Sequence, residues 1–129
     1  MKINKIIDER MKYRGVNQTE LCMECGLTIQ NFNAFIKGKR TLPKESLVKV
    51  MTLLTLYYKK EGENPISPIA IGEKLVSLTK GCGKKLTEIA KETNISASTL
   101  SCIINGKREM SAKAANALID YFGFQVVSL

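Results

Sequence analysis

Two stretches of the 129-residue chain are near repeats of each other, Ile36-Lys37-Gly38-Lys39-Arg40 and Ile104-Asn105-Gly106-Lys107-Arg108. They stand 68 positions apart, and at the same offset Thr19-Glu20 matches Thr87-Glu88. The chain aligns with itself at this offset without a gap over residues 3–54, with ten of 52 positions identical. Many of the other positions keep their apolar character, so the two halves share the register of a core. The sequence therefore predicts two copies of one fold.

Each copy is expected to form four short helices, because apolar residues recur at helical spacing between glycine, asparagine and proline breaks. In the first copy the predicted helices cover residues 3–14, 18–25, 29–37 and 44–59. In the second copy they cover residues 69–80, 85–93, 97–105 and 112–122. The side chains suited to cap helix N-termini are Asn17, Thr28, Ser96 and Ser111. We therefore predict an all-α protein.

The two copies are expected to be separate domains. Residues 61–68 contain a glycine, two prolines and two acids, which is typical of a linker and leaves domains at 1–60 and 69–129. The apolar run 48–58 is expected to lengthen the fourth helix and to pack against the second copy or a dimer mate. The tail 124–127 could form a short strand that pairs across a dimer.

The composition narrows the possible functions. Lysine and arginine number 20 against 12 acids, a net charge of +8 that favours a polyanionic partner. The chain has no histidine, which excludes histidine-based triads and HExxH metal sites. No apolar run approaches the roughly 20 residues of a membrane span. Cys22 and Cys25 form a CxxC pair, but without further ligands at metal-binding spacing we interpret them as buried reduced thiols.

A helix, a tight turn and a second helix of similar length form the plan of a helix-turn-helix. The first copy carries Gln18-Thr19-Glu20-Leu21-Cys22, Gly26-Leu27-Thr28 and Ile36-Lys37-Gly38-Lys39-Arg40. The second carries Leu86-Thr87-Glu88-Ile89-Ala90 and Asn105-Gly106-Lys107-Arg108. In these motifs each copy resembles the XRE family of lambda-repressor-like, Cro-type helix-turn-helix domains. The resemblance implies DNA binding, with the third helix of a copy in the major groove and the second helix across the backbone.

The residues of the first copy suit that role. If the third helix buries its phenylalanines, Ile29, Gln30, Asn33 and Lys37 face outward, and the two amides match the donor–acceptor pattern of adenine. Lys39 and Arg40, which follow the helix, are expected to contact phosphate groups. Gln18 matches the phosphate-contacting glutamine of the family. The candidate DNA-binding residues of this copy are Gln18, Thr28, Ile29, Gln30, Asn33, Lys37, Lys39 and Arg40.

The second copy is expected to recognise DNA less strongly than the first. Its exposed positions carry small side chains, and Leu86 stands where the first copy has Gln18. Residues 69–129 have a net charge of +3, against +7 for residues 1–60. The candidate DNA-binding residues of this copy are Ser96, Ala97, Ser98, Ser101, Lys107 and Arg108.

The resemblance implies a transcriptional regulator, most often a repressor in this family, that binds double-stranded DNA. We expect no cofactor and no enzymatic activity. One chain could place both third helices on DNA, or two chains could form a homodimer in which only the first copy reads. The competing interpretation is an antitoxin or other interaction protein whose second copy binds a protein partner. We expect a cytoplasmic, nucleoid-associated protein of bacterial or phage type, with no membrane contact.

Overall fold

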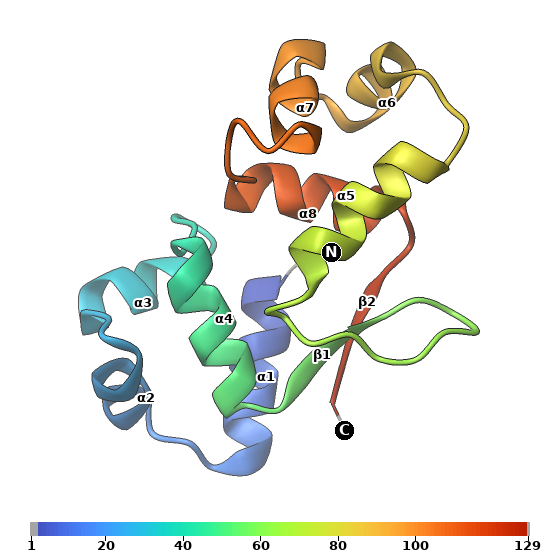
Figure 1. The fold of residues 1–129 in the computed structure, drawn as a ribbon. Helices are drawn as coiled ribbons and strands as arrows, with labels where there is room; N and C mark the ends of the chain where they lie inside the picture. Colours follow the sequence, from blue (N-terminus) through green and yellow to red (C-terminus); the bar gives the residue numbers. More distant parts are fainter. Residues whose placement is uncertain (1–2, 129) are drawn as a thin grey trace.

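The computed structural model describes residues 3–128 as a largely helical protein with one small sheet (Figure 1). The elements of the first half are α1 (Ile3–Arg14), α2 (Gln18–Cys25), α3 (Ile29–Ile36), α4 (Lys44–Leu53) and β1 (Leu56–Lys59). Those of the second half are α5 (Ile71–Gly81), α6 (Leu86–Thr93), α7 (Ala97–Ile104), α8 (Ala112–Tyr121) and β2 (Gln125–Ser128). The order of elements is therefore the same in both halves.

The predicted caps explain where four of the eight described helices begin. The Asn17 side chain accepts a hydrogen bond from Thr19 N at 2.8 Å, so α2 begins at the next residue. The hydroxyls of Thr28, Ser96 and Ser111 each accept a hydrogen bond from the backbone N–H three residues further on. The helices α3, α7 and α8 begin directly after these capping residues. Each cap satisfies an amide that has no partner within its helix. All four predicted caps are confirmed.

The repeat seen in the sequence is also present in the backbone. Gly26 ends α2 in the left-handed conformation with φ 68°, and its equivalent Asn94 ends α6 with φ 60°. Thr55 after α4 and Gly123 after α8 are a second such pair, with φ of 53° and 79°. A β-branched residue rarely adopts this conformation. Its occurrence at Thr55 shows that the surrounding structure imposes the turn.

The prediction of a helix over residues 44–59 is wrong beyond Leu53. The chain turns at Thr55 and continues as β1, so α4 and α8 have ten residues each. Arginines of α1 cap the end of α4: Arg14 Nη1 donates to Leu53 O at 2.9 Å, and Arg10 Nε donates to Leu54 O at 3.2 Å. These contacts from α1 stop the helix at a position that apolar periodicity alone does not mark. The α5 helix also begins at Ile71, two residues later than predicted.

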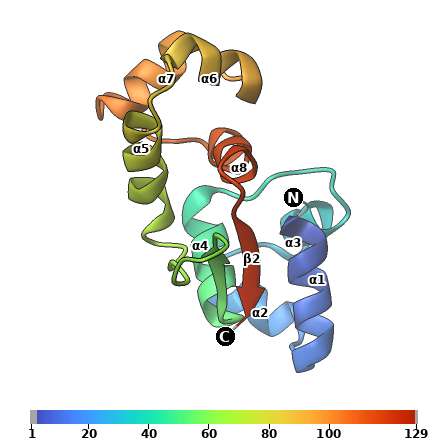
Figure 2. The ribbon, with the colours of Figure 1, turned by 90° about the vertical axis from the view of Figure 1, so that its right-hand side faces the viewer.

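The two strands pair with each other within one chain, which corrects the suggestion that the tail pairs across a dimer. The strands β1 and β2 are antiparallel, and Tyr58 lies opposite Val126. These residues are 68 positions apart, so they are the same position in the two copies. An antiparallel pair centred on equivalent residues is symmetric about an axis through that pair. In Figure 2, β2 runs from α8 toward the first copy, where this pairing occurs.

Equivalent residues of α4 and α8 line one small cavity of about 30 Å³. Its walls include the equivalent pairs Leu47 and Ala115, Val48 and Asn116, and Met51 and Ile119. Residues 61–68, predicted as a linker, are partly held in place, because Tyr58 and Ile66 exchange backbone hydrogen bonds of 2.9 and 2.7 Å. The buried side chains of both halves form one continuous cluster.

The turn after α8 offers a test of the backbone repeat. We expect G123T to lower the free energy of unfolding by about 1–2 kcal/mol, because threonine is strained at positive φ. A Cβ at Gly123 meets no atom within 4 Å, so the cost is in the backbone alone. In the first copy Arg10 Nη2 donates to the Thr55 hydroxyl at 3.2 Å, whereas the equivalent of Arg10 is Leu78, which has no donor.

Urea unfolding of G123T and of a matched variant measures this cost. Gly81, at the end of α5, has equally open surroundings but an ordinary φ, so G81T should leave stability nearly unchanged or slightly higher. Equal losses in the two variants would contradict the assigned role of the left-handed turn.

The tyrosine at the centre of the sheet makes stability sensitive to alkali. Tyr58 is 3% exposed, and burial raises its pKa to about 12. An unfolded tyrosine ionises near pH 10, whereas the folded protein keeps Tyr58 neutral up to about pH 12. The free energy of unfolding is therefore at its full value below pH 10 and falls between pH 10 and 12 as the unfolded state ionises. The loss is about 2 kcal/mol at pH 12.

The variant Y58F isolates this effect, because within residues 3–128 the Tyr58 hydroxyl donates to no acceptor other than Met51 Sδ, a weak one at 3.3 Å. We expect similar unfolding free energies for the wild type and Y58F at pH 8, and a more stable Y58F above pH 11. A difference between the two proteins that does not change with pH would refute the prediction.

Candidate functional site

The exposed face of α3 is the first component of the candidate site. Phe32 and Phe35 are buried, with ring centroids 6.0 Å apart, and they anchor the inner face of the helix. Ile36 is half-buried beside them. The outer face presents the residues that the sequence predicted, all exposed: Ile29, Gln30, Asn33 and Lys37. A short polar and apolar surface is thus held on a rigid helix.

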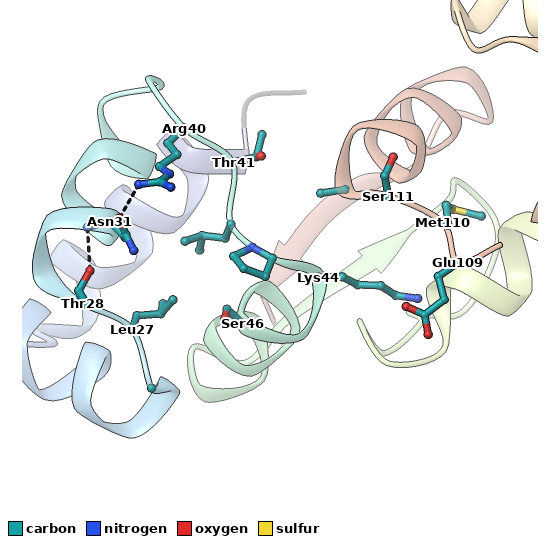
Figure 3. A pocket seen from close by; sticks show the side chains of 14 residues that line it. Leu27, Thr28, Asn31, Arg40, Thr41, Lys44, Ser46, Glu109, Met110 and Ser111 are labelled. Atoms are coloured by element: carbon teal, nitrogen blue, oxygen red, sulfur yellow. Dashed lines mark hydrogen bonds between the residues drawn. The ribbon is translucent and has the colours of Figure 1, made fainter. Parts of the chain in front are cut away.

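The segment after α3 carries a fixed cation. Gly38 turns the chain with φ 78°, and Lys39 and Arg40 follow it, both exposed. Arg40 Nη1 donates to Asn31 Oδ1 at 2.6 Å, and Asn31 N donates to the capping hydroxyl of Thr28 at 3.2 Å (Figure 3). The guanidinium of Arg40 therefore lies beside the first turn of α3. A charge-assisted bond of this length reduces the freedom of a long side chain.

Gln18 is the first residue of α2 and is half-buried. It follows the capping residue Asn17, so it lies at the positive end of the helix. Its position is therefore compatible with contact to an anion at the start of α2. In the second copy Leu86 occupies the equivalent position and is also half-buried. The second copy has no amide at that place.

The second copy repeats the site with shorter and weaker groups. Three residues at the start of α7, Ser96, Ala97 and Ser98, are exposed, but Ser101 is half-buried and accepts from Asn105 Nδ2 at 3.3 Å. Lys107 and Arg108 are exposed. Arg108 Nη1 stands 3.5 Å from Thr99 Oγ1, at the limit of a hydrogen bond. Arg108 is thus held in the same place as Arg40 but less firmly.

A cleft of about 680 Å³ joins the two copies beside α3 (Figure 3). One wall carries Thr28, Asn31 and Arg40, and the other carries Glu109 and Ser111 from the segment before α8. Sequence reasoning identified neither Asn31 nor Glu109. The only available signal was that Asn31 aligns with Thr99, another short polar residue that can accept a bond from the following arginine.

The CxxC pair lies within the core of the first copy. Cys22 and Cys25 are 1% and 3% exposed, which confirms their interpretation as buried thiols. Burial raises the pKa of both, so they remain protonated and poorly reactive at neutral pH. Among residues 3–128 there is no cluster of three histidine, cysteine, aspartate or glutamate side chains that could hold a metal ion.

Comparison with models of protein families, with curated proteins and with solved structures finds no match to this chain. Within the described part of the chain, no helix is both long enough and apolar enough to cross a membrane.

Proposed function

We propose that the protein binds duplex DNA in a sequence-specific manner and regulates transcription by occupying an operator. In this proposal α2–α3 and α6–α7 act as helix-turn-helix units, as the resemblance to lambda-repressor-like domains implies. The proposal is supported by two neighbouring features. The outer face of α3 exposes the amides of Gln30 and Asn33, and Arg40, held by a hydrogen bond to Asn31, follows the helix. The second copy repeats the following arginine at the same offset, but serines replace the two amides and the arginine is less firmly held.

The α3 face supplies groups suited to base edges. Gln30 and Asn33 are exposed on successive turns, and each amide offers the donor and acceptor that match adenine N7 and N6. Ile29, 50% exposed at the start of α3, offers an apolar surface for the methyl group of thymine. A good bidentate contact discriminates against a wrong base by about 1–3 kcal/mol. These three side chains are therefore the proposed source of sequence preference.

The basic residues supply affinity that does not depend on sequence. Lys37, Lys39 and Arg40 are exposed at the end of α3 and just after it, where phosphates flank a helix in the major groove. Each phosphate neutralised releases counterions, so binding should weaken steeply as salt rises. With residues 1–60 at a net charge of +7, the first copy is the larger contributor.

Selection of bound duplexes from a random-sequence pool at near-physiological salt tests the proposal. We expect convergence on one motif, and we expect N33A to relax the preference at one or two base pairs within it. E45A, on the exposed surface of α4, is a control that should select the wild-type motif. A pool that does not converge, with only weak salt-sensitive binding, would contradict the proposal and favour a protein partner.

A further inference from the structure

We infer that one chain is a complete reader of an asymmetric DNA site made of two different half-sites in opposite orientation. This inference rests on the proposed function and adds the arrangement, orientation and stoichiometry of the DNA target. Two copies in series along a chain give no orientation by themselves, because repeated domains on a flexible linker can bind direct or inverted repeats. The symmetry of the fold supplies that information.

The orientation follows from the strand register. Leu56 pairs with Ser128 and Lys59 with Gln125, so Tyr58 and Val126 are centred on each other. Because these two are equivalent positions, the strand pair has a local twofold axis, as expected if the copies are related by half a turn and not by a translation. A rotation of this kind places α3 and α7 in opposite directions about one axis. Duplex DNA has matching twofold axes perpendicular to its length, so inverted half-sites fit such a pair.

The two copies are also held in place rather than loosely tethered. Met51 and Ile119, equivalent residues of α4 and α8, are 0% and 1% exposed and line the same small cavity. The β1–β2 pair crosses between the copies, and Ile66 is hydrogen-bonded to Tyr58 on the other side of β1. In Figure 1, α3 lies to the left of α4 and α7 lies above α8. The spacing of the half-sites should therefore be fixed.

The half-sites differ because the two reading faces differ. The α3 face offers the long amides Gln30 and Asn33, whereas the equivalent positions on α7 are Ser98 and Ser101. Ser98 is exposed, but Ser101 is half-buried and its hydroxyl accepts a hydrogen bond from Asn105. The α7 face therefore reads fewer base edges, through short hydroxyls and the Ala97 methyl group. We assign the stronger half-site to α3 and the weaker one to α7.

The first test measures the motif selected from the random pool and the mass of the complex formed on it. The inference predicts an imperfect inverted repeat bound by one 14.3 kDa chain. A direct repeat, or a perfect palindrome bound by two chains, would overturn the inference and leave the proposed DNA binding intact. Absence of any enriched motif would overturn both, and this outcome is distinct from the other two.

The second test uses altered versions of the selected duplex. Reversing the weaker half-site, or inserting five base pairs between the half-sites, should lower affinity at least about 10-fold, to the level of a duplex carrying the stronger half-site alone. Unchanged affinity for the five-pair insertion would show that the copies are not held in fixed relation.

Paired substitutions then assign each half-site to its helix. The double variant Q30A/N33A should lose discrimination only in the stronger half-site, and S98A/S101A only in the weaker one. Thermal unfolding of each variant checks that the fold is retained, because Ser101 is half-buried, whereas Gln30, Asn33 and Ser98 are exposed. Loss of discrimination in both half-sites from either double variant would contradict the assignment of one helix to one half-site.

Discussion

Reversing the charges of Lys39 and Arg40 in the double variant K39E/R40E should weaken binding to the selected duplex by on the order of 100-fold. Both side chains are exposed in the turn that follows α3, and Arg40 is fixed by its 2.6 Å bond to Asn31. The substitution removes two cations and adds two anions at the proposed position of the DNA backbone. Fluorescence anisotropy over a series of salt concentrations should also show a salt dependence reduced by about two phosphate contacts.

The matched variant K107E/R108E makes the same change in the second copy. We expect a smaller loss, about 10-fold, because Arg108 is less firmly held at 3.5 Å from Thr99 and the second copy has a net charge of only +3. No loss from this pair would show that the second copy does not touch DNA, in favour of a protein-binding role. No loss from either pair would contradict the proposed function.

The largest loss of stability is expected from F32A, about 3–5 kcal/mol. Phe32 is 0% exposed at the centre of the inner face of α3. Truncation leaves a cavity between α3 and the neighbouring helices α1 and α2, which contact it. The free energy of unfolding in urea, followed by far-ultraviolet circular dichroism, measures the loss.

The equivalent residue Leu100, 1% exposed in the second copy, provides the matched variant L100A, with an expected loss of about 2–5 kcal/mol. Because the buried cluster is continuous and β1 pairs with β2, both variants should unfold in one transition. Two separate transitions, with only one of them shifted by each variant, would show that the copies fold independently.

Much of the secondary structure was predictable because local signals decide it. Capping side chains and left-handed residues mark helix ends within a few positions, and α2 matches its predicted range, Gln18–Cys25. The end of α4 was not predictable in this way. It depends on Arg10 and Arg14, which are about 40 residues away in sequence and reach the last carbonyls only after α1 has packed.

In the candidate site, too, features set by local spacing were predictable, and features set by the path of the chain were not. The exposure of Gln30 and Asn33 follows from helical spacing relative to Phe32 and Phe35, so periodicity predicted it. The bond from Arg40 to Asn31 depends on the path of the chain after Gly38, which the sequence does not specify. The twofold relation between the copies could not be predicted either, since a sequence repeat fits a translation as well as a rotation.

The pairing of Tyr58 with Val126 has a further consequence for how such a regulator would respond to its own abundance. A reader assembled from two separate chains comes apart on dilution, and its occupancy rises with about the square of the chain concentration. Here both halves belong to one chain, so the interface persists however few molecules a cell contains. Under the proposed function, occupancy of the operator would follow a simple hyperbola, and a mutation in α3 would change one half-site without changing the other.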